Sequence, residues 1–130
     1  MDVTTDARLA ERAFGVWEGT TVADRVRDTP QAVERWDAYS DPGVEGSEPA
    51  ADAGTRFAEA LAEHSARHES VLAVGHGAAA RLGIQSLLGM GTGRGFEGLG
   101  NTQSAVLRRR ADDWRLLRYG IGPSTVPGPL

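Results

Sequence analysis

His76 has the setting in this sequence that most favours chemistry. It lies in the stretch VLAVGHG, residues 71–77, where four apolar residues and a glycine precede it and a second glycine follows. A short apolar run without polar alternation predicts a strand buried on both faces, and the residues after it predict a helix. Ligands bind at the carboxyl ends of strands in open α/β sheets, and a helix amino terminus favours anions such as phosphate. The pattern therefore predicts an anion site at His76, although a structural histidine in a tight turn would give the same pattern.

Two carboxylates near the amino terminus are candidates for proton transfer. Glu11 and Glu18 lie close in sequence to Phe14 and Trp17. A carboxyl group beside apolar rings can have its pKa raised, so that it donates a proton near neutral pH. The alternative is that both glutamates are ordinary solvated acids.

Two further histidines, His64 and His68, are four residues apart on a predicted helix. This spacing can bind a metal ion, but no third ligand lies nearby in the sequence. The alternative is a pair of partly exposed side chains at a helix carboxyl end, where positive charge is favoured. We therefore predict no metal site.

Composition restricts the class of protein. The 130 residues fit one domain, with 40% hydrophobic residues, no cysteine and a formal net charge of −4. This charge argues against wholesale binding to nucleic acid or to an anionic membrane surface. The sequence has no apolar run of the ~20 residues that span a bilayer and no signal-peptide pattern, so we expect no membrane partner. A protein without cysteine is suited to a reducing compartment, and we expect it in the cytoplasm.

Proline divides the region before the histidine motif. Pro30 interrupts a helical pattern, so two short helices are expected, the second with Thr29 as its cap and Pro30 at its first position. The residues expected to form the buried stripe of the second helix recur every three positions: Val33, Trp36 and Tyr39.

A longer helix and a hairpin complete the expected elements. The longer helix is predicted from Ser47, as its amino-terminal cap, to about His68. Residues 104–119 contain two apolar-rich runs around a three-residue turn, which predicts a β-hairpin. The tail, 121–130, is rich in proline and glycine and is expected to be disordered, so one domain covers residues 1–120.

Four motifs occur along the chain in a particular order. Residues 9–19 read LAERAFGVWEG, 46–57 read GSEPAADAGTRF and 71–81 read VLAVGHGAAAR, and Asn101 then precedes the expected hairpin. Together they resemble the L-x-E-x-x-F-G-x-W-E-G, G-G-E-S-x-x-D-x-x-x-R and S-H-G blocks in the carboxyl-terminal portion of the histidine phosphatase family, the phosphoglycerate-mutase-like proteins. The positions that depart from these blocks are Ser47, Pro49 and Gly75.

The resemblance implies a three-layer α/β/α sandwich of the phosphoglycerate-mutase-like type. The chain offers about four strands, so we expect an incomplete, mixed sheet that ends in the carboxyl-terminal hairpin. In the family, the two strands without a counterpart here flank the strand that corresponds to residues 71–74. An apolar strand with two unpaired edges is unstable in water. Three outcomes stay open: the remaining strands close ranks, the chain self-associates, or a separate piece fills the gap.

The resemblance also assigns roles. In the family a phosphoryl group moves to a histidine and then to water, and the substrate is a small phosphorylated metabolite. His76 matches the second histidine, which hydrogen-bonds the phosphoryl oxygens, and Glu11 matches the proton donor to the leaving group. We further expect Gly77, Arg81 and Asn101 to bind substrate or phosphate. The resemblance implies no metal and no organic cofactor.

One family motif has no counterpart. The nucleophilic histidine belongs to an R-H-G motif that precedes the L-x-E block, and R-H-G does not occur in these residues. Covalent catalysis needs that nucleophile, so we expect a phosphatase or phosphomutase domain that is weak or inactive as this chain alone. The alternatives are a non-catalytic pseudo-phosphatase that binds an anion or a protein partner, and a longer protein with an upstream R-H-G segment.

Overall fold

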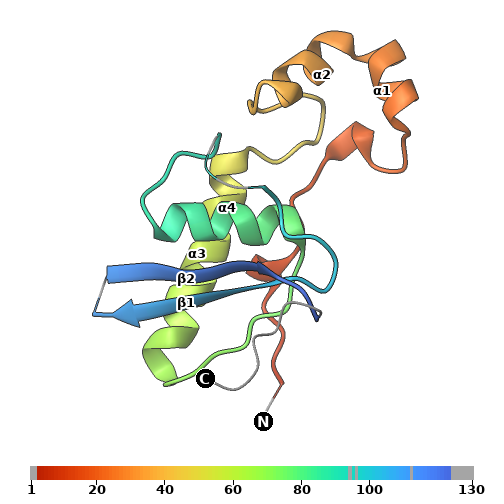
Figure 1. Cartoon of the computed structure of the whole chain (residues 1–130). Helices are drawn as coiled ribbons and strands as arrows, with labels where there is room; N and C mark the ends of the chain where they lie inside the picture. The colour runs from red at the N-terminus through yellow and green to blue at the C-terminus, as the bar shows by residue number, and fades with distance from the viewer. Residues whose placement is uncertain (1–2, 94, 96, 112, 124–130) are drawn as a thin grey trace.

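The computed structural model describes residues 3–93, 95, 97–111 and 113–123. In these residues, long and short helices precede a hairpin (Figure 1). The elements are the 3₁₀ turns η1 (Ala7–Leu9) and η2 (Gly15–Trp17), the helices α1 (Val22–Asp28), α2 (Pro30–Asp37), α3 (Ala50–Arg67) and α4 (Gly77–Leu87), and the strands β1 (Ser104–Arg110) and β2 (Asp113–Ile121).

The core lies where α4 crosses α3. Leu82 is fully buried there against Ala50 and Ala53. Two glycines allow the close approach: a side chain at Gly54 would meet the Leu82 carbonyl oxygen at 2.9 Å, and one at Gly83 would overlap the Phe57 ring. Small residues thus let the two helices pack almost backbone to backbone.

Two of the expected helix starts have different outcomes. The break at Pro30 is confirmed, with Thr29 as the N-cap residue of α2, although its side chain makes no capping hydrogen bond. The expected cap at Ser47 is wrong, because α3 begins at Ala50 with Pro49 as its N-cap residue. The Ser47 hydroxyl instead donates to the carbonyl of Val44 at 2.8 Å, within the turn that precedes the helix.

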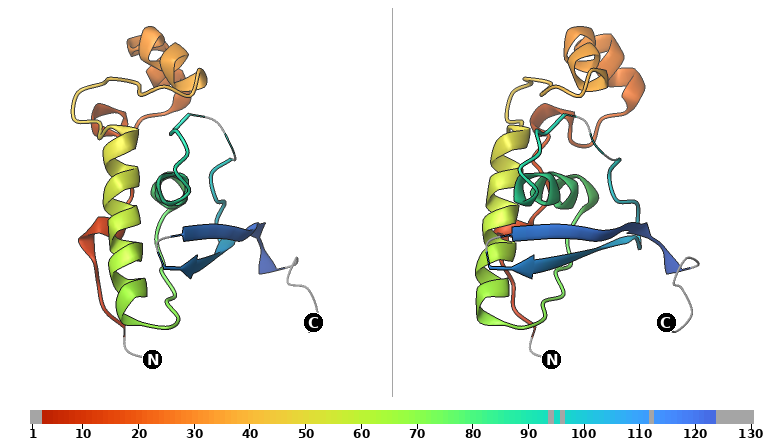
Figure 2. Two further views of the ribbon diagram at one scale, coloured as in Figure 1. Left: turned by 90° about the vertical axis from the view of Figure 1, so that its left-hand side faces the viewer. Right: turned by 60° about the vertical axis from the view of Figure 1, so that its left-hand side comes forward.

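The expected buried stripe of α2 is also wrong. Trp36 and Tyr39 are 37% and 54% exposed, and Ala32 is the buried residue of this helix. The reason is tertiary: α1 and α2 stand away from the α3–α4 layer, as Figures 1 and 2 show. Trp36 packs edge-on against Phe14 and Trp17 at centroid distances of 5.6 and 6.1 Å, so the helix rests on the η2 turn and not on the main core.

The hairpin is confirmed and is the only sheet among the described residues, with β1 and β2 antiparallel. The expected three-residue turn is wrong, because Asp113 already belongs to β2 and pairs with Arg110. β2 continues to Ile121, one residue beyond the expected domain end. Residues 124–130, most of the tail expected to be disordered, lie outside the described residues.

We expected about four strands, and the described residues form two of them. Residues 71–74 run as irregular backbone without a strand partner. A β-strand requires a neighbour for its N–H and C=O groups. The strand expected at residues 71–74 is therefore wrong for this structure, because the segment has no such neighbour among the described residues.

Candidate functional site

His76 lies where the sequence placed it, between the segment 69–75 and α4. It is the N-cap residue of α4, with extended φ and ψ of −116° and 153°, and its side chain is exposed. Gly77 follows as the first helical residue. A side chain at Gly77 would overlap the carbonyl oxygen of Leu99, so glycine here lets the loop before the hairpin cross the start of α4.

Glu11 reaches the same helix terminus from a distant part of the chain. Its Oε1 accepts hydrogen bonds from the backbone N–H of Ala79, at 2.9 Å, and of Arg12, at 2.8 Å. One of the free N–H groups in the first turn of α4 is therefore satisfied by this carboxylate, where the helix dipole favours negative charge. The fold thus brings Glu11 and His76, 65 positions apart in the numbering, to one end of one helix.

Arg56 holds the backbone that carries Glu11. From α3, its guanidinium donates to the carbonyl oxygens of Arg8, Ala10 and Glu11 at 2.6, 2.9 and 3.2 Å. It also pairs with both carboxylate oxygens of Glu48, at 2.7 and 2.8 Å, and this pairing lowers the pKa of Glu48. Sequence reasoning did not single out these two residues, although both lie in the 46–57 motif.

Arg12 is a second residue that sequence reasoning missed. Its side chain is buried, donates to Asp41 at 2.6 Å and to the Glu48 carbonyl at 2.7 Å, and lies over the Trp36 ring at 5.6 Å. The sequence signal for this residue is its position directly after the predicted catalytic glutamate. The contacts connect the Glu11 segment to the loop between α2 and α3.

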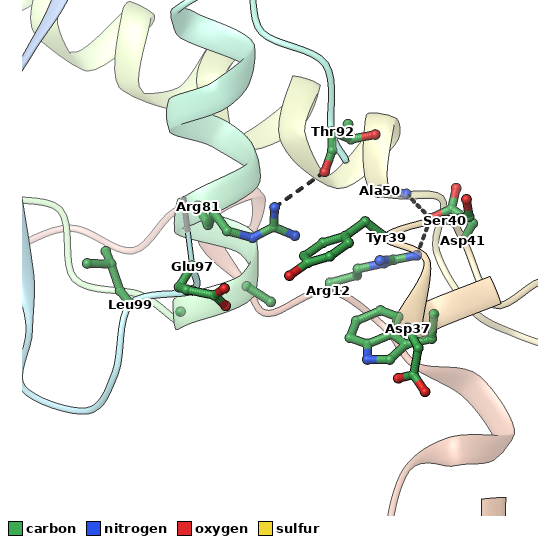
Figure 3. A pocket seen from close by; sticks show the side chains of 14 residues that line it. Arg12, Asp37, Tyr39, Ser40, Asp41, Ala50, Arg81, Thr92, Glu97 and Leu99 are labelled. Carbon is green, nitrogen blue, oxygen red and sulfur yellow. Dashed lines mark hydrogen bonds and ion pairs between the residues drawn. The ribbon is translucent and has the colours of Figure 1, made fainter. Parts of the chain in front are cut away.

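A cavity of about 640 Å³ opens beside the start of α4 (Figure 3). Gly77 and Arg81 of the expected site line it, whereas His76, Glu11 and Asn101 do not. Asn101 lies in an exposed turn ahead of β1. The full lining is Arg12, Trp36, Asp37, Tyr39, Ser40, Asp41, Ala50, Gly77, Ala78, Arg81, Thr92, Glu97, Gly98 and Leu99.

Arg81 provides positive charge on the wall of this cavity. Its Nη1 donates to Gln85 Oε1 at 2.9 Å and to the Thr92 carbonyl at 3.3 Å. These bonds fix the guanidinium while it reaches into the cavity toward the Tyr39 ring (Figure 3). The lining therefore combines the Arg81 guanidinium with aromatic, hydroxyl and carboxylate groups, the last from Asp37, Asp41 and Glu97, so the cavity carries both signs of charge.

Two other possible features, a metal site and a membrane-spanning helix, have no support in the described residues. His64, half-buried, lies 3.0 Å from an Asp6 carboxylate oxygen, and no group of three or more potential metal ligands occurs among the described residues. The described part of the chain also contains no helix long and apolar enough to cross a membrane.

Comparison with known proteins agrees with the motifs. A family model described as "Histidine phosphatase superfamily (branch 1)" matches residues 1–122. A mycobacterial glucosyl-3-phosphoglycerate phosphatase in complex with inorganic phosphate is 25% identical, with a TM-score of 0.81 over 94% of this chain. A protein described as mycobacterial hydrolase 1 is also 25% identical, with a TM-score of 0.80 over 90% of this chain. Bacillus stearothermophilus YhfR, at 23% identity and a TM-score of 0.78 over 88% of this chain, shows likeness of fold alone.

These likenesses confirm the expected incomplete fold of the phosphoglycerate-mutase-like type. The chain spans 66%, 62% and 59% of the three matched structures, in the order given above. No curated protein matches the sequence.

Proposed function

The chain belongs to branch 1 of the histidine phosphatase superfamily, and from this premise we propose that it is a phosphomonoesterase-type domain acting on a small phosphorylated metabolite. The observation that carries the proposal is the meeting of Glu11 and His76 at the amino terminus of α4. Free N–H groups at a helix start, an imidazole and a carboxylate are the groups that phosphoryl transfer uses to stabilise charge and to protonate a leaving group.

In this proposal the two groups have separate roles. His76 hydrogen-bonds the phosphoryl oxygens, and Glu11 protonates the leaving oxygen. Glu11 currently accepts from the Ala79 N–H, so a bound phosphate would share the first turn of α4 with the carboxylate. Arg56 and Glu48 act indirectly, as positioning residues for the Glu11 backbone.

The cavity accommodates the organic part of the substrate. Gly77 belongs to both the His76 turn and the cavity wall, so a phosphate at the turn would direct the rest of its molecule toward Arg81. A cation beside Tyr39 and Ser40 suits a sugar phosphate or a phosphoglycerate-like acid. The matched phosphatase is described as acting on glucosyl-3-phosphoglycerate, which supports this substrate class for the present chain.

We further propose that these 130 residues alone have little turnover. R-H-G does not occur in the sequence, so the family's nucleophile is missing from the helper groups just described. A domain that binds phosphate but has no nucleophile should bind phosphorylated anions and release them unchanged.

Phosphate binding and aryl phosphate hydrolysis by the purified chain test the proposal. We expect saturable binding of inorganic phosphate by calorimetry that falls at least tenfold in His76→Ala, and no robust hydrolysis of p-nitrophenyl phosphate. His68→Ala is the matched control, because this exposed histidine at the end of α3 should leave binding unchanged. Absence of phosphate binding, or robust hydrolysis that His76→Ala abolishes, would contradict the proposed roles.

A further inference from the structure

We propose that Tyr39 is a specificity-determining residue, whose ring contacts the uncharged, hydroxyl-bearing organic part of a phosphate ester in the cavity beside α4. The inference rests on the proposed function, since it names the residue that distinguishes a sugar phosphate from phosphate alone. Two independent observations carry it: the backbone conformation of Tyr39 and the direction of its side chain.

Tyr39 follows α2 in a backbone conformation that suits glycine. Its φ is +60°, in the left-handed region. Its N–H donates to the Trp36 carbonyl, and the N–H of Ser40 donates to the Arg35 carbonyl, both at 2.9 Å. These two bonds form the Schellman motif, which closes a helix through a left-handed residue that is usually glycine. A side chain at this position raises the free energy of the folded state, because its Cβ crowds the following carbonyl oxygen.

The end of α4 has the same geometry and does contain glycine. Gly89 has a φ of +67°, and its N–H donates to the Ser86 carbonyl at 3.1 Å. The N–H of Met90 donates to the Gln85 carbonyl at 2.8 Å, which completes the motif. Gly89 does not line the cavity, whereas Tyr39 does. A bulky left-handed residue on a cavity wall indicates selection for what its side chain contacts, because the turn itself is made equally well with glycine.

The fold makes little use of the Tyr39 side chain. The residue is 54% exposed. Within the described ranges its hydroxyl makes no hydrogen bond and its ring packs against no other aromatic ring, in contrast to Trp36, which contacts Phe14 and Trp17. The ring is therefore available to a ligand.

The ring extends into the cavity, with its hydroxyl end toward Arg81 and Glu97 (Figure 3). A sugar presents C–H groups on its ring faces and hydroxyls at its rim. It can therefore pack on the Tyr39 ring while its hydroxyls bond to the guanidinium and carboxylate nearby. The carboxylates of Asp37, Asp41 and Glu97 in the same lining disfavour a second acidic group on the ligand.

Calorimetric titration of the full 130-residue protein with glucose 6-phosphate and with inorganic phosphate tests this role. We expect the wild type to bind glucose 6-phosphate at least tenfold more tightly than inorganic phosphate. Tyr39→Gly should lower the affinity for glucose 6-phosphate at least fivefold. It should leave the affinity for inorganic phosphate unchanged, because His76 does not line the cavity. Its urea midpoint should stay the same or rise, because glycine suits the left-handed conformation.

Two further variants serve as controls. Ala111 also has a left-handed φ, +52°, in the exposed turn between β1 and β2, and it does not line the cavity. Ala111→Gly should therefore change neither affinity. Tyr39→Phe keeps the ring and loses the hydroxyl, so its affinity for glucose 6-phosphate should lie between those of the wild type and Tyr39→Gly.

The outcomes separate this inference from the proposed function. If the wild type binds both ligands equally, or if Tyr39→Gly lowers both affinities together with the urea midpoint, the specificity role of Tyr39 is overturned and the phosphate site stands. Tyr39→Phe and Tyr39→Gly with equal affinities would overturn the contact with the ring. Binding of glucose 6-phosphate that needs Tyr39, without binding of inorganic phosphate, would support this inference and count against the phosphate site. Binding of neither ligand would overturn both.

Discussion

Two regions of this molecule differ in whether their apolar side chains are buried and their backbone groups are hydrogen-bonded. Around α3 and α4, glycine and alanine allow close contact, and Leu82 is fully buried. Along residues 69–75, Leu72 and Val74 are exposed and the backbone makes no hydrogen bonds within the described chain. The α3–α4 region is a packed core, whereas residues 69–75 form a surface whose backbone has no hydrogen-bond partner within the described chain.

The difference follows from the two kinds of secondary structure. A helix satisfies its backbone within a single segment, so α3 and α4 need only each other to form a core. A strand satisfies its backbone only through adjacent strands, and these strands can be remote in sequence or on another chain. A partial sandwich can therefore keep its helices while its sheet is reduced to the hairpin.

Truncation of one leucine in each region should give the largest contrast. Leu82→Ala should lower the free energy of unfolding by about 2–5 kcal/mol, because it removes buried methyl groups and leaves a cavity between α3 and α4. Leu72→Ala should change it by less than about 0.5 kcal/mol, because that side chain already contacts water. Urea denaturation of both variants measures the difference, and equal effects would show that residues 69–75 are buried in solution.

Removal of Arg56 tests how the α3–α4 core supports the site. Arg56→Met should cost about 1.5–3 kcal/mol, because it removes charge-assisted hydrogen bonds to Glu48 and to the backbone of the Glu11 segment. It should also weaken phosphate binding, since Glu11 loses its support. Arg67→Met, which breaks an exposed pair with Glu63, should cost less than about 1 kcal/mol and leave binding unchanged. Equal losses in the two variants would remove the positioning role of Arg56.

The pH dependence of stability should show the smallest effect. The Arg56 pairing lowers the pKa of Glu48, and bonds from Arg8 and then His64 hold the pKa of Asp6 well below its usual range. In each case the folded protein binds its proton less readily than the unfolded chain does. The resulting stability is therefore fully present above the ordinary carboxyl pKa and is lost as the pH falls through the lowered values.

The urea midpoint should accordingly fall between pH 5 and pH 3, the region of about 4 where carboxylates ordinarily titrate. Glu48→Gln should flatten part of this decline, because it removes one group whose protonation opposes folding. Glu59→Gln, a change at an exposed glutamate of α3, is the control and should follow the wild-type profile. A Glu48→Gln profile that coincides with wild type would show that the Arg56 pair contributes nothing measurable to acid stability.

Local signals predicted much of the fold. Pro30 determined the division between α1 and α2, and the apolar runs after Ser104 determined the hairpin. The glycines around His76 predicted the turn into α4, and the motifs 9–19, 46–57 and 71–81 indicated the family. Each of these signals depends on residues that are near one another in the chain.

Long-range contacts account for what the sequence did not predict. The exposure of Trp36 and Tyr39 depends on where α2 lies relative to the core, and Ser47 forms a bridge with Phe14 while α3 begins only at Ala50. Arg56 reaches the Glu11 backbone across 45 positions, a contact that no local pattern reports. The site residues His76 and Glu11 were individually predicted, whereas the helix terminus that joins them became visible only in three dimensions.

The sequence by itself determined the helices, the hairpin and the types of side chain available for phosphate chemistry, because turn residues and apolar spacing act over a few positions. Only the tertiary structure decided that residues 71–74 form no strand, that Arg81 faces a cavity and that Glu11 meets α4. The physical reason is that strand pairing and side-chain convergence are properties of neighbours in space, and a periodicity along the chain carries no information about whether those neighbours are present.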